Sequence, residues 1–139
     1  MSDCIFCKII AGDIPAHKVY EDDLVLAFLD IAPITKGHTL VIPKIHQESI
    51  SAVPSEYQHR ILEISSKIGK AFVRTQEYDG FNLHLNNGQC AGQVVPHAHM
   101  HVVPRIGTDG FHWNWRNLEY KENEIEELLS KFNEKFSAS

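Results

Sequence analysis

Three histidines alternate with apolar residues in the run His97-Ala98-His99-Met100-His101. In an extended strand, residues two apart point to the same face and lie about 6.6–6.8 Å from each other. The histidines therefore form one row, and Ala98 and Met100 belong to an apolar row on the opposite face. The run predicts a strand within residues 94–104, in a sheet that presents three imidazoles on one surface.

Four further segments have the composition of strands. Two short β-prone runs flank an acidic turn and indicate a hairpin, and a third run ends at a proline that cannot donate to a ladder. The fourth alternates strictly between apolar and polar residues, so Asn82, His84 and Asn86 share its polar face. In residue numbers the four segments are 18–20, 24–30, 38–43 and 81–86.

Two segments have helical periodicity. Apolar side chains recur at three- and four-residue steps between residues 54 and 77, which places them on one face of a helix. Residues 124–136 repeat this pattern with acidic residues early and lysines late, so we expect a C-terminal helix that packs on the domain. Because the element order lacks βαβ alternation, we expect an α+β fold, an antiparallel sheet with its helices gathered on one side.

The size and charge of the chain limit its architecture and its partners. Its 139 residues, 43% of them hydrophobic, can bury one core, so we expect a single domain over residues 1–139. The net charge of −5 provides no general attraction to nucleic-acid polymers or anionic membranes. No apolar run approaches the roughly 20 residues of a membrane-spanning helix, and the N-terminus lacks a secretory pattern. We therefore expect a cytoplasmic protein.

Residues beside the histidine run indicate a phosphate site. Gly92 and Gln93 immediately precede the run and supply a flexible turn and an amide that can hold a phosphate oxygen. Asn86 ends the neighbouring polar row. Backbone N–H groups in a glycine-containing loop also bind anions, so an acidic protein can accept a phosphate without a basic patch. Taken without the histidines, the Gly-Gln pair favours a plain loop over a phosphate site.

Cys4 and Cys7 are separated by two residues, the gap that lets two thiolates reach one zinc ion. A tetrahedral structural site needs two further ligands, for which His46 and His97 are the candidates. The alternative is a pair of reduced, unliganded cysteines, because the sequence has no second CxxC motif. An odd number of cysteines, three, also fits a reducing compartment better than a disulfide framework.

The histidine run and its surroundings resemble the histidine triad (HIT) family, whose hallmark is His-φ-His-φ-His-φ-φ with φ apolar. Residues 97–103 match every position of this motif. The resemblance spans about residues 4–106 and leaves a C-terminal extension over 107–139. The other matching segments are Ile5-Phe6, Ile14-Pro15-Ala16, 20–23, 27–31, 37–46 and Gly92-Gln93. The resemblance implies a five-stranded antiparallel sheet with one long helix and a C-terminal helix, and a homodimer that joins two such sheets.

The resemblance also implies a two-step reaction through a covalent nucleotidyl-histidine. His99 matches the nucleophile, which attacks the α-phosphorus of a nucleoside phosphoramidate or a related adenosine nucleotide, and water or a second acceptor then releases the nucleotide. Two other histidines complete the implied catalytic set. His101 would contact the phosphate oxygens together with Gln93 and Asn86, and His38 would hold the nucleophile in its productive tautomer.

The nucleoside and the metal have implied sites as well. Asp30 matches the residue that binds the ribose hydroxyls in the family. The residues that would line the base pocket are Phe6, Ile14, Phe28 and Ile31, with core packing as the alternative role. In many bacterial members zinc is held at the positions that match Cys4, Cys7, His46 and His97. Such a closed shell leaves no open position, so the zinc would be structural.

The sequence leaves the leaving group and the turnover open. Val94 occupies a position where the phosphoramidate-hydrolysing branch often has a serine, and residues 103–111 also resemble the dinucleoside polyphosphate hydrolase branch. A nucleotide-binding regulatory protein without turnover is the alternative from another class. For Trp113 and Trp115 we expect dimer contact or packing, with substrate contact as the alternative.

Overall fold

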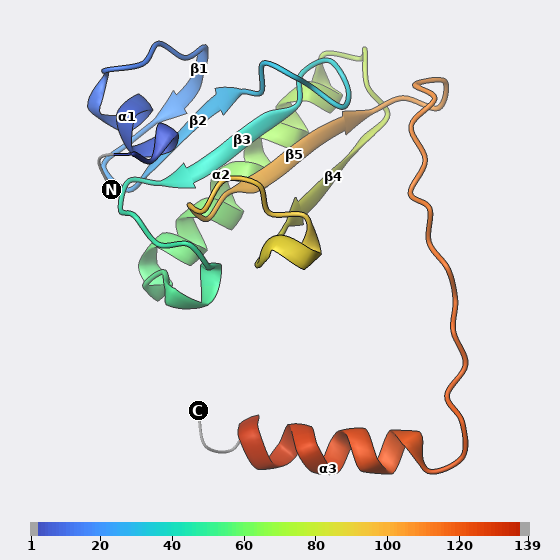
Figure 1. Ribbon diagram of the computed structural model, residues 1–139. Helices are drawn as coiled ribbons and strands as arrows, with labels where there is room; N and C mark the ends of the chain where they lie inside the picture. Colours follow the sequence, from blue (N-terminus) through green and yellow to red (C-terminus); the bar gives the residue numbers. More distant parts are fainter. Residues whose placement is uncertain (1–2, 137–139) are drawn as a thin grey trace.

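The chain forms an antiparallel sheet with a helix against each face, as the computed structural model shows for residues 3–136 (Figure 1). The strands lie in the order β1-β2-β3-β5-β4, and all neighbours are antiparallel. The strand bounds are β1 (Lys18–Glu21), β2 (Val25–Leu29), β3 (Thr39–Pro43), β4 (Gly80–Leu85) and β5 (Met100–Arg105). The helices are α1 (Ile5–Ala11), α2 (Ser55–Arg74) and α3 (Glu124–Phe136), with 3-10 turns at Ile50–Ala52 and Gln89–Ala91. The α+β class and a strand in each predicted segment are confirmed.

Different helices cover the two faces of the sheet. Leu26 and Phe28 of β2 pack in one apolar cluster with α1, while Val25 and Ala27 of the same strand pack in a second cluster with α2. The alternation follows from the two-residue period of a strand. The expectation that the helices gather on one side of the sheet is therefore wrong. Helix α1 has only seven residues, too few to display a helical period in the sequence.

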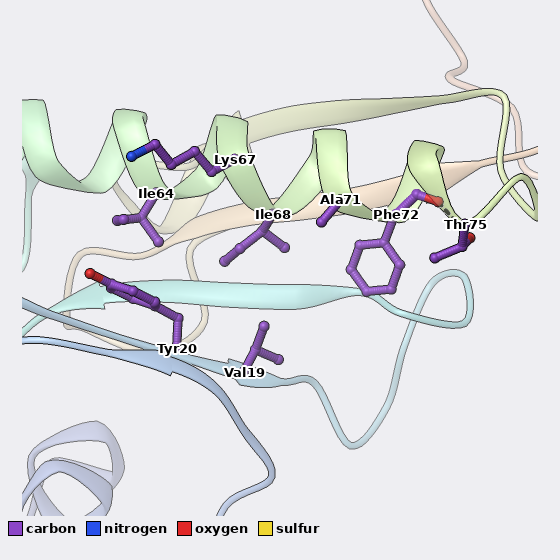
Figure 2. Close-up of a pocket in the computed structure, with 8 residues that line it drawn as sticks. All are labelled: Val19, Tyr20, Ile64, Lys67, Ile68, Ala71, Phe72 and Thr75. Atoms are coloured by element: carbon purple, nitrogen blue, oxygen red, sulfur yellow. Dashed lines mark hydrogen bonds between the residues drawn. The ribbon is translucent and has the colours of Figure 1, made fainter.

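Helix α2 packs on the sheet through the face that its periodicity predicts. Ile61, Ile64 and Ile68 are buried there. The helix comes closest to β4 at Gly69, where an added Cβ would lie 2.3 Å from a ring carbon of Phe81. Only glycine allows this approach. On the other side of α2, toward β1, an apolar groove stays open (Figure 2).

The histidine run joins the sheet only at its end. His101 lies in β5, whereas His97 and His99 precede the strand, so the expectation that the whole run is a strand is wrong. The ladder between β3 and β5 stops because Pro43, the last residue of β3, has no N–H to donate. The N–H of Ala98 donates instead to a backbone carbonyl in the loop after β3, at 2.7 Å.

Helix α3 has the predicted bounds but does not pack on the domain. Figure 1 shows it clear of the sheet, at the end of an extended segment that follows β5. None of the residues of α3 is buried. The expectation of a packed C-terminal helix is therefore wrong, because periodicity predicts an apolar face but not the surface that covers it. Within residues 3–136, no helix is long and apolar enough to cross a membrane.

Candidate active site and metal centre

A backbone hydrogen bond sets the tautomer of His38, and His38 in turn sets the tautomer of His101. The N–H of Ile34 donates to Nδ1 of His38 at 3.1 Å, so the proton of a neutral His38 lies on Nε2. That N–H points to Nδ1 of His101 at 2.9 Å. Nδ1 of His101 is then an acceptor, and its Nε2–H remains available to donate. From the sequence we expected His38 to hold the ring of His99, whereas in the structure His38 orients His101 instead.

His99 is oriented by the residue two positions before it. Its Nδ1 lies 2.7 Å from the carbonyl oxygen of His97, and because a carbonyl only accepts, Nδ1 must carry the proton. The lone pair of a neutral His99 is consequently on Nε2. The ring is 6% exposed, and Phe6 of α1 contacts it edge to face at a centroid distance of 5.2 Å. This arrangement holds one imidazole nitrogen ready to act as a nucleophile.

Burial keeps this group of histidines neutral. It lowers the pKa of His99 and of His38 below the ordinary value of 6.5, although the Asp30 carboxylate opposes the shift at both. The pKa of His101 falls to about 3, because burial and the neighbouring imidazoles both disfavour its charged form. Near neutral pH the site therefore offers a lone pair on His99 and a neutral N–H donor on His101.

A fourth histidine, His84, belongs to this group, although from the sequence we expected only its place on the polar face of its strand and no role in the reaction. It pairs with His101 across β4 and β5, and the two rings stack at a centroid distance of 4.3 Å and an angle of 13°. Trp113 contacts the same ring edge to face at 5.2 Å, and its N–H donates to Asn82 at 3.4 Å. The alternation of residues 81–86 was the available signal, since it placed His84 beside Asn86.

The predicted phosphate residues lie in the loop between β4 and β5 and at its start. Asn86 donates from Nδ2 to the carbonyl of Gly92 over 3.5 Å, at the long limit of a hydrogen bond. Both the oxygen and the nitrogen of the Gln93 amide are hydrogen-bonded within the protein. Its oxygen accepts from the N–H of Gly88 at 2.9 Å, and its nitrogen donates to the carbonyl of Glu48 at 2.7 Å. Gln93 therefore ties the loop together in this conformation.

The predicted nucleoside residues separate into two groups. Phe6 and Phe28 are buried edge to face at 5.5 Å beside the triad, and Ile14 packs against the same cluster. Asp30 follows β2, and one of its carboxylate oxygens accepts from a nearby N–H at 2.9 Å. The other oxygen lies 3.8 Å from Nδ1 of His38. Ile31, by contrast, is 92% exposed and is not brought against the other three apolar residues.

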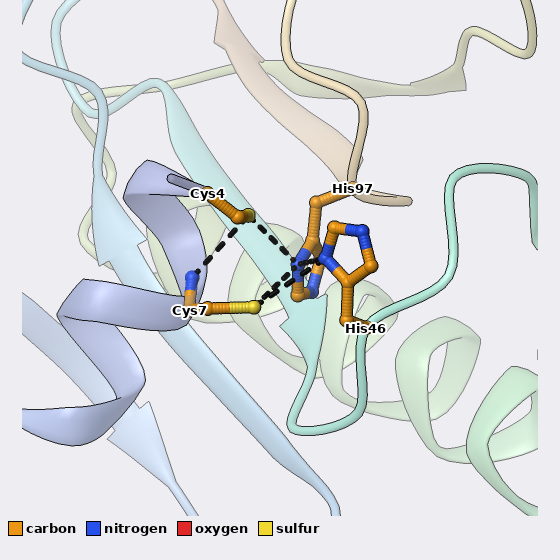
Figure 3. Close-up of side chains that lie close together, drawn as sticks. All are labelled: Cys4, Cys7, His46 and His97. Atoms are coloured by element: carbon orange, nitrogen blue, oxygen red, sulfur yellow. Dashed lines mark hydrogen bonds between the residues drawn. The ribbon is translucent and has the colours of Figure 1, made fainter. Parts of the chain in front are cut away.

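The four predicted zinc ligands converge (Figure 3). Cys4 caps α1 and Cys7 lies in its first turn, whereas His46 and His97 come from the loops after β3 and before β5. Nδ1 of His97 lies 3.4 Å from Sγ of Cys4, 3.7 Å from Sγ of Cys7 and 3.3 Å from Nδ1 of His46. Nδ1 of His46 is 3.4 Å from Sγ of Cys7.

These separations fit a tetrahedral zinc ion. With ordinary Zn–N and Zn–S bond lengths, a tetrahedron has N–N edges of about 3.3–3.4 Å and N–S edges of about 3.6 Å. Nε2 of His97 lies 3.0 Å from the carbonyl of Pro43, so it carries the ring proton and Nδ1 turns a lone pair toward the thiols. Burial raises the pKa of the Cys7 thiol. A bound cation would lower this pKa again, because it favours the thiolate. The donor set therefore fits the metal that the sequence predicts.

Comparison with known proteins agrees with the fold and the motif. The chain matches the HIT domain family model over residues 11–108. It is 40% identical over 133 residues to an adenosine 5'-monophosphoramidase of Schizosaccharomyces pombe, covering 95% of this chain and 97% of that protein. A crystal structure from Streptococcus mutans, 43% identical, superposes with a TM-score of 0.89 over 98% of this chain and 87% of that one. A zinc-bound histidine triad protein from Mycobacterium smegmatis, 37% identical, has a TM-score of 0.76 over 99% of both chains.

Proposed function

Because this chain belongs to the HIT domain family, we propose that it is a nucleotide hydrolase or transferase that acts on nucleoside phosphoramidates through His99. The observation that carries the proposal is the hydrogen bond from Nδ1 of His99 to the carbonyl of His97, which leaves Nε2 unprotonated in a buried site. A relative that matches this chain over nearly the whole length of both proteins is named adenosine 5'-monophosphoramidase.

The first step forms a bond between Nε2 of His99 and the α-phosphorus and breaks the bond to the leaving nitrogen, which takes a proton from solvent and departs as a neutral amine. The ring becomes positively charged as the bond forms, and the His97 carbonyl stabilises that charge through the proton on Nδ1. Nε2–H of His101, whose tautomer is held by His38, donates to a phosphate oxygen. In the second step a water oxygen bonds to the phosphorus, the bond from phosphorus to Nε2 of His99 breaks and restores the neutral imidazole, the water gives a proton to solvent, and the nucleotide leaves with its α-phosphate.

Substrate binding uses the remaining predicted residues. Asp30 binds the ribose hydroxyls. The base contacts the apolar cluster of Phe6, Ile14 and Phe28 on one side and the exposed Ile31 on the other. The amide of Asn86 has only a 3.5 Å contact with the carbonyl of Gly92, so it is readier than that of Gln93 to turn to a phosphate oxygen. Gln93 contributes by holding the loop, and it reaches phosphate itself only if its bonds to the loop exchange.

The proposal includes a structural zinc ion held by Cys4, Cys7, His46 and His97. Zinc would supply a crosslink between α1 and the loops that flank the site, and with four protein ligands its role would be structural. Because His97 also accepts the hydrogen bond from His99, this crosslink helps to orient the nucleophile. We propose in addition a cytoplasmic homodimer. An odd number of cysteines, three, fits a reducing compartment better than a disulfide framework.

The test is AMP release from adenosine 5'-phosphoramidate. His99→Ala should abolish release, whereas His17→Ala, which alters an exposed histidine outside the site, should leave the rate unchanged. AMP release that persists in folded His99→Ala protein contradicts the proposal and favours a nucleotide-binding role without turnover. The same assay with a diadenosine polyphosphate shows which of the two leaving groups is preferred.

A further inference from the structure

Helix α3 presents an apolar face that the rest of its own chain does not cover. Ile125, Leu128, Leu129 and Phe132 lie at the three- and four-residue steps of one helix face, and each is about half exposed, between 47% and 53%. An isolated helix of 13 residues is only marginally stable in water. A partner surface is therefore needed to hold this helix in its folded form.

Residues 111–136 form an arm that ends in α3, and part of this arm superposes on a solved structure. Residues after 110 make up about one fifth of the chain, so a TM-score of 0.89 over 98% of it requires part of this arm to superpose as well. Contacts at the end of β5 and along β4 fix the place where the arm leaves the domain. Arg105 is paired with Asp109, and Trp113 is held on the β4 edge by His84 and Asn82.

The domain also has an apolar groove of about 380 Å³ between α2 and β1. Figure 2 shows Ile64, Ile68 and Phe72 descending from α2 toward Val19 and Tyr20 of β1. The lining is apolar apart from the polar ends of a few side chains at its margin. Its full set of residues is Val19, Tyr20, Ile64, Lys67, Ile68, Ala71, Phe72 and Thr75.

The charges beside the groove and on α3 are complementary. Lys67, Lys70 and Arg74 follow one another along the second half of α2, which has no acidic residue after Glu63. Helix α3 has four glutamates and two lysines. Within residues 3–136, neither the three α2 cations nor Glu126, Glu127 and Glu134 of α3 have an ion-pair partner.

We propose that α3 of one copy of this chain docks in the α2/β1 groove of a second copy. The arm is anchored at β4 and the groove lies at β1, which are opposite edges of the sheet. Figure 1 shows α3 clear of α2 and β1 of its own chain. Exchange of arms between two copies covers both unpartnered surfaces with one contact and closes by two-fold symmetry. The inference goes beyond the proposed reaction and does not depend on it.

Hydrogen exchange of the α3 amides tests this contact. Leu128→Glu places a charge on the apolar face of α3, and Ala71→Glu places one in the groove at an exposed position. Each should reduce the protection of residues 124–136 about tenfold or more, because docking no longer protects the helix. The matched controls are Ser130→Glu on α3 and Ser66→Glu on α2, both exposed and away from the proposed contact, and they should keep the wild-type protection.

Mixing the two variants shows whether the contact is between chains. The Ala71→Glu chain has an intact α3 and the Leu128→Glu chain an intact groove, so an equal mixture should restore protection of the unmutated α3, recognised by its peptide mass. If mixing restores nothing, α3 docks on its own chain and the proposal is overturned. It is equally overturned if Ala71→Glu leaves the protection of α3 unchanged, because α3 then docks elsewhere.

Discussion

Removing the imidazole of His38 should slow the reaction by releasing His101. His38 is 2% exposed, and it transmits the backbone N–H of Ile34 to Nδ1 of His101 through bonds of 3.1 and 2.9 Å. His38→Leu has a similar volume but leaves that Nδ1 without a donor. An unsatisfied buried group costs about 1–3 kcal/mol. If His101 keeps its productive tautomer only by that margin, kcat falls about 5- to 150-fold.

Steady-state AMP release from adenosine 5'-phosphoramidate measures the effect, with little change expected in KM because the lost bond orients a group that acts in the transition state. His38→Gln should recover most of kcat, since its amide N–H can donate to Nδ1 of His101. His17→Gln, at an exposed site, is the matched control. The tautomer argument is refuted if folded His38→Leu protein keeps kcat within twofold of wild type, or if His38→Gln is as slow as His38→Leu.

Three further predictions concern stability. Joint replacement of Cys4 and Cys7 by serine should abolish zinc binding and lower the melting temperature while some activity remains. If elemental analysis finds equal zinc in the wild-type protein and the double variant, the site is ruled out. The pKa of His101 is about 3 in the folded state against 6.5 for an ordinary histidine, so only the unfolded chain gains this proton as the pH falls from 6.5 toward 3. Unfolding free energy from urea titrations should therefore decline over that range by up to about 1.4 kcal/mol per pH unit from this group, and less steeply in His101→Asn. Gly69→Ala should destabilise the protein, because overpacking against Phe81 costs about 1–3 kcal/mol and the better helix propensity of alanine returns only about 1 kcal/mol. In the same titrations, the double variant Gly69→Ala with Phe81→Leu should regain part of the lost stability.

Sequence periodicity was sufficient for most of the secondary structure. The apolar steps in residues 54–77 predict α2, and the strict alternation of residues 81–86 predicts β4 and its polar face. These patterns are local, and a hydrophobic face is a property of the segment itself. Helix α1 was not predicted, because its seven residues contain too few turns to show a helical period.

The sequence by itself determined which residues are chemically competent, namely three alternating histidines and a CxxC pair. It also determined that the chain is acidic and has no basic patch. Only the tertiary structure decided how they divide the work. His38 and His99 take their tautomers from the N–H of Ile34 and the carbonyl of His97. His97 turns its Nδ1 toward the thiols because Pro43, far away in the sequence, accepts its other proton. Side-chain spacing contains no information about these backbone partners, because they are brought together by strand pairing and by the point at which a proline ends it.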